Sequence, residues 1–471
     1  MKDFTVLVPK FLDVNYNILD FDAKEGGLES NTKAIQNAID KAHLNGGGKV
    51  IIPKGLWLTG PIKLKSNVNL HLEKSAFLLF DKNEEEYPLI ITEWEGEKRV
   101  RTVSPISAFD AENIAITGLG TIDGNGDLWR PIKKWKLTDK HFEEKLRISS
   151  YTTGSGDKTI WYPNKSIYEG YLEGEVLANE DNALAKAQKH YDLYRPSLVN
   201  IVRCDKVLIE GVIIQNSPAW NVHPLYTTNL TLRNVSIKND YSAQNGDGLD
   251  IESCKNVEID NCIFNVGDDG ICVKAGKGRE ARQLIFPTEN VYIHDCIVHQ
   301  AHGGFVVGSE TSRGIKNVYV KDCNFIGTDI GIRFKSALGR GGVIEDITLE
   351  NIKMFNIKEE AIIFTMGYVL FNYDKKSEAD LKEVLQDDIP EFKNIKILNS
   401  TCINAKKALE VNGLDVLPIN NITLENVTIV SEEKTSVKNG HNIIMKNVRL
   451  INQNDRCDEF YYALENIGDV K

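Results

Sequence analysis

The sequence predicts an all-β protein built as a parallel β-helix, a solenoid in which the chain winds through stacked coils of short strands. Three observations support this prediction. A short motif recurs ten times between residues 114 and 447. One helical pattern near the N-terminus is followed by runs with the length and composition of short strands. The chain has 471 residues, which is long enough for one extended repeat array over residues 1–471.

The N-terminal segment, about residues 14–48, is expected to cap this solenoid. Residues 14–27 have the pattern of a strand and a turn. Apolar residues then recur at helical spacing, in a helix that Ser30 or Asn31 could cap and that the glycines at 46–48 could end. Further strands are predicted at residues 49–53, 56–59, 68–72 and 76–80.

The repeat is defined by its spacing. An apolar residue at position zero is followed by an apolar residue at position two and by Gly, Asn or Asp at position four. Position five is apolar in every copy except the one that carries Ser400. The residues at position zero are Ile114, Val207, Leu230, Val257, Val291, Val318, Ile347, Ile395, Ile422 and Ile443.

This spacing has a direct physical interpretation. Positions zero and two lie on one face of a strand. Position four needs a left-handed backbone conformation, which Gly, Asn and Asp tolerate best. Position five is expected to begin a strand in a new direction with its side chain inward. Leucine-rich and other solenoids lack this Asn or Asp turn between two short strands, so the pattern favours the β-helix.

Three of the eight cysteines, Cys262, Cys296 and Cys323, occupy position five in consecutive coils. A metal or redox site is one interpretation. A ladder of small buried apolar side chains is favoured, because free cysteine behaves as a small hydrophobic residue in protein cores. The cysteines do not have the pattern of a small secreted disulfide scaffold.

Two insertions interrupt the coils. Residues 128–196 mix charged and aromatic side chains with a helical run at 179–194, and residues 369–391 are acidic. Long excursions from a solenoid often cover its binding face, so the first insertion is expected to shape a cleft. The second has no functional interpretation from sequence.

The composition limits the choice of partner. The formal net charge of −11 argues against nucleic acid and against an anionic membrane surface. The chain has no run of eighteen apolar residues, and residues 1–17 do not have the pattern of a signal peptide. A cytoplasmic protein is therefore expected, or a secreted one if a leader has been removed. An anionic substrate would require cations placed locally in the cleft.

Three aspartates are expected to converge. Asp247 lies in one coil, and Asp268 and Asp269 lie in the next, about 5 Å away by the spacing of neighbouring strands. Crowded carboxylates cannot all ionise freely, so at least one pKa should rise. Such a group suits acid and base catalysis of glycoside hydrolysis. The alternative is a calcium site formed by Asn245, Asp247 and Asp250.

The following coils favour an anionic sugar over calcium. His302 lies among glycines that leave room for a ligand, and Arg333 and Lys335 lie two residues apart on one face of a strand. This cation pair supplies the local positive charge that the acidic chain otherwise lacks. The alternatives are a structural histidine and salt bridges from the two cations to the aspartates.

These residues match the motifs of a known family, and the chain resembles the polygalacturonases of glycoside hydrolase family 28 over residues 15–450. The glycine-rich segment 120–126 is similar to an early motif of that family. Four further motifs occur in the family's order. They are Asn245-Gly246-Asp247, Gly267-Asp268-Asp269, His302-Gly303-Gly304 and Arg333-Phe334-Lys335.

The resemblance implies a right-handed parallel β-helix that hydrolyses α-1,4-galacturonide bonds with inversion, without a metal or other cofactor. By the same resemblance Asp268 is the general acid, and Asp247 and Asp269 hold and activate the water. His302 supports the acid.

The resemblance also assigns substrate binding. It implies that Arg333 and Lys335 bind the sugar carboxylate. Asn245 in the first motif and Tyr368, one coil beyond Lys335, are further candidates for substrate contact. Gly246 and Phe334 replace the family's usual Thr and Ile, and neither side chain is required for the chemistry.

The chain resembles in particular the bacterial exo-acting branch, in which longer loops close one end of the groove. The extra residues before His302 carry this resemblance, together with the segment Gly308-Ser309-Glu310. The extra residues include Lys274, Lys277, Arg279 and Arg282. We therefore expect exo action on short oligogalacturonides.

Three other functions remain open from the sequence. The first is a rhamnogalacturonan-type or unsaturated-galacturonide exo-hydrolase on the same fold. The second is a pectate lyase, which would need calcium and would form an unsaturated product that absorbs in the ultraviolet. The third is a non-catalytic polysaccharide-binding β-helix, which would bind without turnover.

Overall fold

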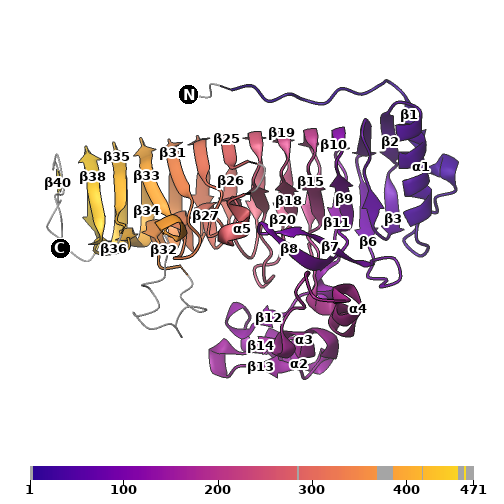
Figure 1. The fold of residues 1–471 in the computed structure, drawn as a ribbon, viewed down its shortest axis with the longest axis horizontal. Helices are drawn as coiled ribbons and strands as arrows, with labels where there is room; N and C mark the ends of the chain where they lie inside the picture. The colour runs from indigo at the N-terminus through magenta and orange to yellow at the C-terminus, as the bar shows by residue number, and fades with distance from the viewer. Residues whose placement is uncertain (1–3, 284–285, 369–385, 416, 454–460, 463–471) are drawn as a thin grey trace.

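The computed structural model describes residues 4–283, 286–368, 386–415, 417–453 and 461–462. Its strands stack into coils that follow one another along the long axis of the molecule, with the N-terminal helix at one end (Figure 1). The two large sheets have 13 and 22 strands, and neighbouring coils pair in parallel in both, apart from the antiparallel pairing of residues 448–449 with 461–462. The predicted parallel β-helix is confirmed.

The N-terminal cap consists of β1 (Asn15–Asn17), a 3₁₀ turn η1 (Ile18–Phe21) and helix α1 (Thr32–Leu44). Ile35 and Ile39 of α1 are fully buried against the first coil. Asn31 occupies the N-cap position, but its side chain makes no capping hydrogen bond. Its amide instead donates to the carbonyl oxygen of Leu58 at 3.0 Å, and so ties the cap to the strand below.

The four strands predicted after the helix are confirmed within one residue. They are β2 (Gly48–Ile52), β3 (Gly55–Thr59), β5 (Val68–Leu72) and β6 (Ala76–Phe80). The sequence did not predict the short β4 (Ile62–Lys63) or the antiparallel ribbon formed by β7 (Leu89–Trp94) and β8 (Glu97–Thr102).

The ten repeat copies supply strands of the 13-stranded sheet, and their position-zero residues stack in register, as Val207 does on Leu230. All ten residues at position four have positive φ, from 51° to 114°, as the repeat predicts. The strands are β10 (Glu112–Gly118), β16 (Asp205–Glu210), β19 (Thr228–Arg233), β22 (Lys255–Asp260), β25 (Thr288–His294), β28 (Ile315–Lys321), β31 (Val343–Glu350), β33 (Glu391–Leu398), β35 (Ile419–Glu425) and β38 (Gly440–Lys446).

The first copy departs from the predicted pattern at position five, where Leu119 is 63% exposed. The strand pairing explains the difference. Ile114 pairs with Val207 in the first sheet, whereas Thr121 pairs with Ile213 in the second, so this turn holds one extra residue. The prediction of an inward side chain is therefore wrong for Leu119 and confirmed for the other nine copies, Ser400 included.

The 22-stranded sheet contains the strands that carry the family motifs. Those strands are β21 (Leu249–Glu252), β24 (Ile271–Lys274), β27 (Gly303–Val307), β30 (Ile330–Lys335) and β32 (Lys353–Thr365). Its other strands are β9 (Ile106–Phe109), β11 (Thr121–Asp123), β15 (Val199–Val202), β17 (Ile213–Gln215), β18 (Val222–Leu225), β20 (Ser236–Lys238), β23 (Ile263–Asn265), β26 (Ile297–His299), β29 (Asn324–Ile326), β34 (Thr401–Asn412), β36 (Thr428–Glu433), β37 (Ser436–Lys438), β39 (Val448–Asn452) and β40 (Tyr461–Tyr462), with β3, β4 and β6.

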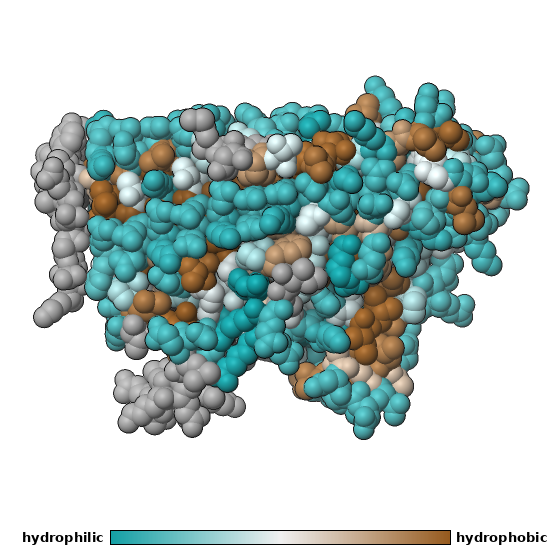
Figure 2. All heavy atoms as spheres, turned by 45° about the horizontal axis from the view of Figure 1, so that its top comes forward, coloured by the Kyte–Doolittle hydropathy of each residue, from teal (hydrophilic) through white to brown (hydrophobic). Residues whose placement is uncertain are grey.

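The core lies between the sheets. Cys262, Cys296 and Cys323 are free, fully buried and stacked in consecutive coils, so the ladder of small apolar side chains is confirmed. The face turned forward in Figure 2 is mainly hydrophilic, with apolar side chains in scattered spots. This follows from the period-two alternation of strands, which directs one set of side chains inward and the other outward.

The insertion at 128–196 projects from one side of the solenoid (Figure 1). It contains helices α2 (Asp139–Ile148), α3 (Lys165–Glu173) and α4 (Ala183–Ala187), strands β12 (Ile132–Lys133), β13 (Thr152–Thr153) and β14 (Ile160–Trp161), and the 3₁₀ turns η2 (Gly126–Leu128), η3 (Lys134–Lys136), η4 (Gly156–Lys158) and η5 (Gln188–Leu193). The helical run predicted at 179–194 is confirmed as α4 and η5. The sequence did not predict α2 or α3.

Of the second insertion, residues 369–385 lie outside the described residues. The rest includes the 3₁₀ turn η8 (Gln386–Asp388), whose Asp388 is 5% exposed. Asp388 accepts hydrogen bonds from Arg279, which lies in helix α5 (Gly278–Ala281), and from Arg282, which follows the helix. The described part of this insertion therefore packs on the loop that follows β24. None of the described helices has the length and apolar character needed to cross a membrane.

Candidate active site

The strand register of the second sheet brings the motifs together. Leu249, Ile271 and Phe305 pair across β21, β24 and β27. Asp247 lies two residues before Leu249, and Asp269 lies two residues before Ile271. Because Leu249 and Ile271 pair, the two aspartates occupy equivalent places in adjacent coils. By the same count Asp268 is stacked below His302. Residues separated by 55 positions in the sequence thus meet on one surface.

Asp268 and His302 form the most direct contact in this group. The Nδ1 atom of His302 lies 3.0 Å from Oδ1 of Asp268, and the His302 backbone N–H donates to the Asp268 carbonyl oxygen at 2.9 Å. Burial alone would raise the pKa of Asp268. The charge and hydrogen bond of His302, with Lys335 and Lys136 nearby, outweigh burial and hold that pKa well below its usual range.

Asp247 has the opposite environment. It is 3% exposed, and its Oδ1 atom has no hydrogen-bond partner. Burial raises its pKa well above the usual value, and the negative charges of Asp268 and Asp250 raise it further. The pKa of Asp250 is also raised by burial. The predicted rise of at least one carboxyl pKa is therefore found at Asp247, where burial is the larger cause and the neighbouring carboxylates add to it.

Asp269 is held by a buried ion pair. Lys335 donates to Oδ2 of Asp269 at 2.6 Å, and the two side chains are 6% and 2% exposed. The salt bridge that the sequence left open for Lys335 is therefore present. The Oδ1 atom of Asp269 has no hydrogen-bond partner, so it remains available to a water molecule or a substrate hydroxyl.

Arg333 is the cation of the pair that retains free donors. Its Nε atom has no hydrogen-bond partner, and it makes no ion pair with a described residue. The ring of Tyr368 lies beneath it, with the guanidinium carbon 5.2 Å from the ring centre. Lys335 lies 4.8 Å from the same ring centre, so Tyr368 packs against both cations, while its predicted contact with the substrate stays a prediction.

The first insertion contributes two side chains that the sequence did not assign to the site. Trp135 has a ring nearly parallel to that of His302, with 6.4 Å between centres, and its side chain is exposed. Lys136 donates to the carbonyl oxygens of Tyr241 and Gly267, beside the acidic motif. The insertion therefore contacts the predicted site residues, and its role in shaping a cleft stays a prediction.

Asp329 is a further residue that sequence reasoning missed. Its carboxylate lies 3.7 Å from Nε2 of His302 and 2.8 Å from Nζ of Lys358. Both ring nitrogens of His302 therefore face carboxylates, Asp268 on one side and Asp329 on the other. No local sequence pattern distinguishes Asp329. Like Asp268 and Asp269 before β24, it lies just before a strand of the second sheet, β30.

The basic residues at the end of β24 and in the loop after it form internal contacts. Lys274 pairs with Glu310 at 3.0 Å and with Asp250 at 3.4 Å. Lys277 pairs with Glu95 on the β7–β8 ribbon. With Arg279 and Arg282 held by Asp388, these cations fix loops in place and are not free donors for a substrate.

Two groups of residues contain the oxygen or nitrogen atoms that a metal site needs. Asp268, Asp269 and His302 each place one potential ligand atom within 4.8 Å of the others. The calcium alternative of Asn245, Asp247 and Asp250 is disfavoured by charge, because the ammonium group of Lys274 already lies against Asp250. Asp269 is likewise neutralised by Lys335. Carboxylates already paired with lysines are poor ligands for a hard divalent cation.

Comparison with known proteins was made by sequence and by structure. Residues 150–449 match the family model for "Glycosyl hydrolases family 28". An exo-poly-alpha-D-galacturonosidase of Dickeya chrysanthemi is 29% identical over 464 residues, covering 94% of this chain and 72% of that protein. An endo-polygalacturonase of Pectobacterium carotovorum subsp. carotovorum is 27% identical over 431 residues, covering 88% of each chain.

Among solved structures, the chain is similar to a hyperthermoactive exopolygalacturonase from Thermotoga maritima. The TM-score is 0.77 at 28% identity, and the match covers 97% of this chain and 94% of that one. The shared fold is a right-handed parallel β-helix, so the predicted handedness is confirmed.

Proposed function

Because the chain belongs to glycosyl hydrolase family 28, we propose that it hydrolyses α-1,4-galacturonide bonds with inversion and acts from the end of the substrate chain. The observation that carries this proposal is the cluster of Asp247, Asp268 and Asp269. These carboxylates occupy adjacent coils and have different environments, which separates their acid and base roles. Similarity to exo-acting relatives supports the exo mode.

We assign the proton donor to the pair formed by Asp268 and His302. The two side chains share a 3.0 Å hydrogen bond. In the free protein the contacts with His302 and Lys335 outweigh burial and hold the pKa of Asp268 low. When a sugar covers the site and excludes water, the charged form of Asp268 is disfavoured and its pKa rises, so Asp268 takes up a proton. Asp268 then delivers it to the leaving glycosidic oxygen.

Asp247 and Asp269 hold the attacking water in this mechanism. Each has one carboxylate oxygen without a hydrogen-bond partner, and the two lie in adjacent coils. Asp269, which pairs with the ammonium group of Lys335, accepts the proton of the water while Asp247 orients it. The oxocarbenium-like transition state is positively charged, so the anionic Asp269 also stabilises it.

Substrate binding follows from the same surface. We assign the sugar carboxylate to Arg333, whose guanidinium has free donors and matches a carboxylate in a two-point contact. The ring of Tyr368 contacts both the Arg333 guanidinium and the Lys335 ammonium group, and so helps to hold the Arg333 side chain in place. Asn245 and Trp135 lie at the rim of the site, where they would contact neighbouring sugars.

The first test is Asp268→Asn. We expect kcat on trigalacturonate to fall by about 10²–10⁴-fold, the usual contribution of a general acid, with an unchanged circular dichroism spectrum. Asp20→Asn, in the exposed 3₁₀ turn of the cap, is the matched control and should retain full activity. Activity of Asp268→Asn within a factor of two of the unmodified protein would refute the assignment.

The second test is a product profile over time, with a chelator present, on trigalacturonate and on long polygalacturonate. Release of one small product from the start supports exo hydrolysis. A ladder of oligomers would show endo action. An unsaturated product that absorbs in the ultraviolet would show a lyase, and binding without any cleavage would show a non-catalytic module. Cleavage confined to rhamnose-containing or unsaturated oligomers would favour the alternative exo-hydrolases.

A further inference from the structure

Four polar side chains form a row along the candidate active site, one from each of four adjacent coils. They are Asp268, His302, Asp329 and Lys358. Nδ1 of His302 lies 3.0 Å from Asp268, and Nε2 of the same ring lies 3.7 Å from Asp329. Lys358 lies 2.8 Å from Asp329 on its other side. The proposed mechanism uses only the first of these contacts, so it gives Asp329 and Lys358 no role.

Backbone hydrogen bonds hold the row in register. The His302 N–H donates to the carbonyl oxygen of Asp268 at 2.9 Å. In the next coil the Asp329 N–H donates to the carbonyl oxygen of Ala301 at 2.8 Å. The Ile330 N–H donates to that of His302 at 3.1 Å. The main chain of His302 is therefore fixed on both sides, which leaves the orientation of its ring to side-chain contacts.

The orientation of this ring decides whether a nitrogen atom faces Asp268. A half-turn about the bond between Cβ and Cγ would put carbon atoms in the places of Nδ1 and Nε2. The ring of Trp135 lies nearly parallel to that of His302, with 6.4 Å between centres. A half-turn leaves the His302 ring in the same plane, so the contact with Trp135 does not favour either orientation. The two carboxylates make that choice.

Asp329 favours the same orientation as Asp268 does. The group that one ring nitrogen faces helps to fix the place of the other. At 3.7 Å the contact between Nε2 and Asp329 is longer than a hydrogen bond, so it acts by electrostatic attraction. The side chains of His302 and Asp329 are only 20% and 19% exposed, which limits screening by water.

Lys358 holds the Asp329 carboxylate in place. It donates to Oδ1 of Asp329, whereas Oδ2 faces His302. Lys358 also lies 4.5 Å from the ring centre of Tyr241. Burial would lower the pKa of Lys358, but the hydrogen bond and charge of Asp329 outweigh burial and raise that pKa. Because one oxygen is held by Lys358, the other is kept toward the histidine ring.

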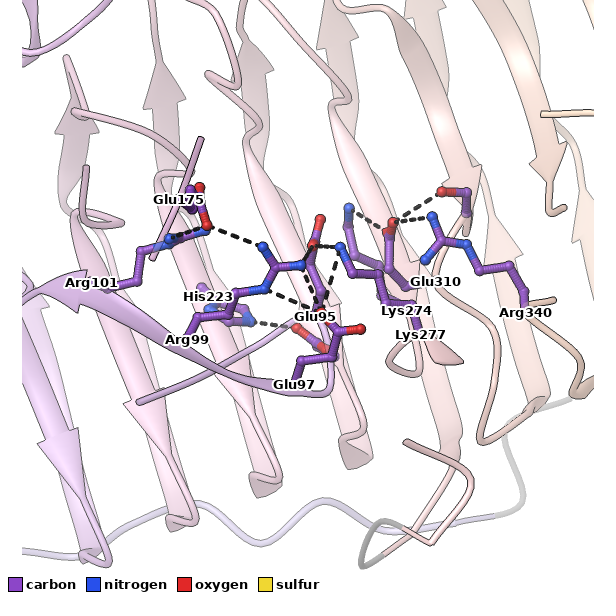
Figure 3. Close-up of polar contacts among 12 residues, drawn as sticks. Glu95, Glu97, Arg99, Arg101, Glu175, His223, Lys274, Lys277, Glu310 and Arg340 are labelled. Atoms are coloured by element: carbon purple, nitrogen blue, oxygen red, sulfur yellow. Dashed lines mark hydrogen bonds and ion pairs between the residues drawn. The ribbon is translucent and has the colours of Figure 1, made fainter. Parts of the chain in front are cut away.

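This arrangement differs from the ion pairs elsewhere around the site, which connect one loop to another. Lys277, in the loop after β24, pairs in this way with Glu95 at the turn of the β7–β8 ribbon (Figure 3). Asp329 contacts a lysine through one oxygen and a ring nitrogen of His302 through the other. Its charge therefore acts on a side chain that contacts the proposed acid.

We propose that Asp329 is a positioning residue for the proton donor. Held by Lys358, it fixes the His302 ring in the orientation that presents Nδ1 to Asp268. Asp329 acts through the ring and does not contact the reacting atoms, so the chemical step depends on it and substrate binding does not. This inference rests on the proposed function and adds a second carboxylate behind the histidine.

The first experiment is steady-state kinetics of Asp329→Asn on trigalacturonate. Asparagine has nearly the shape of aspartate and no charge, so the ring loses the attraction that orients it. We expect kcat to fall about tenfold to hundredfold, as for a group displaced by about 1 Å, while KM changes by less than about twofold. Asp329→Glu keeps the charge and should recover part of kcat. A rise in KM with unchanged kcat would show contact with the substrate, and this result or unchanged kinetics would overturn the proposal.

A double-mutant cycle with His302→Asn shows whether Asp329 acts through the ring. In the His302→Asn background, Asp329→Asn should lower kcat by less than about twofold further. The same loss in both backgrounds would mean that Asp329 acts independently of His302, and the proposal would be wrong. If Asp329→Asn fails to fold, Lys358→Gln replaces it, because loss of the anchor should also lower kcat. An unchanged kcat in Lys358→Gln would then overturn the proposal.

Asp40→Asn is the matched control. Asp40, in helix α1 at the end of the solenoid, also lies 2.8 Å from a lysine, Lys65, so this variant removes a similar ion pair far from the histidine. It should leave kcat and KM unchanged, and an equal fall in kcat would count against a specific role for Asp329. No cleavage by the unmodified protein would overturn the proposed function, and this inference with it. Cleavage by the unmodified protein with an unaffected Asp329→Asn would overturn this inference alone.

Discussion

At the scale of single residues, the site separates three aspartates by their neighbours. Asp268 shares a hydrogen bond with His302, and Asp269 accepts one from Lys335. Asp247 is buried beside other carboxylates and has one oxygen without a partner. A residue placed so unfavourably for its own ionisation is retained for chemistry at a cost in stability.

This cost predicts the behaviour of Asp247→Asn. The pKa of Asp247 in the folded protein is raised above its unfolded value, so the unfolded state releases the proton first as pH rises and folded stability falls. Asparagine has nearly the same shape and no charge. We therefore expect the variant to melt at a higher temperature than the unmodified protein at pH 7, with a smaller difference at pH 4, where Asp247 is protonated in the folded state.

Melting curves at both pH values would check this prediction, with Asp20→Asn as the control that should show no such dependence. If the melting temperature of Asp247→Asn minus that of the unmodified protein is smaller at pH 7 than at pH 4, the prediction is wrong. Turnover should be lost in the same variant, which links the stability gain to the loss of function.

At the scale of elements, the turn at position four holds the coils together. Each of the ten residues there adopts positive φ, and neighbouring turns approach closely. At Gly118 an added Cβ would overlap the carbonyl oxygen of Leu72 in the coil below. Glycine is needed at this turn for its conformation and for the closeness of the next backbone.

A matched pair of variants separates these two requirements. Gly118 has φ of 114° and Gly26 has φ of 113°, but an added Cβ at Gly26 meets no atom within 4 Å. Gly26→Ala should cost about 1–2 kcal/mol for its backbone conformation. Gly118→Ala should cost at least about 2 kcal/mol more, because two coils must move apart. Urea unfolding of both variants provides the measurement, and equal costs would show that backbone conformation alone matters.

At the scale of the whole molecule, stability is built from contacts between adjacent coils. The N-terminal end of the stack is closed by α1, whose buried face packs on the first coil. Open strand edges promote association, so this cap also keeps the solenoid from pairing with another chain. A destabilising substitution at one end should therefore affect the nearest coils most, and its effect on stability should decrease along the axis.

Ile39→Glu tests this local character. A buried charge at a fully buried position should detach α1, so hydrogen exchange should accelerate in β1, β2 and β5 while β28, β31 and β33 remain protected. Asn37→Glu, at an exposed position of the same helix, is the control and should leave exchange unchanged. Uniform acceleration along the whole stack would show instead that the solenoid unfolds as one cooperative unit.

The sequence by itself determined the coil, its turns and the motif residues, because each depends on spacing within a few residues: apolar positions zero and two, a left-handed position four, and carboxylates one coil apart. It did not determine the extra residue that exposes Leu119, since a one-residue slip leaves the apolar pattern intact. Only the tertiary structure decided which charges pair. The ion pair of Lys335 with Asp269, the contact of Asp329 with His302, and the hydrogen bond of Arg195 with Asn245 join residues whose meeting depends on the paths of long loops. Those paths are set by packing against the finished solenoid, and no local sequence pattern encodes them.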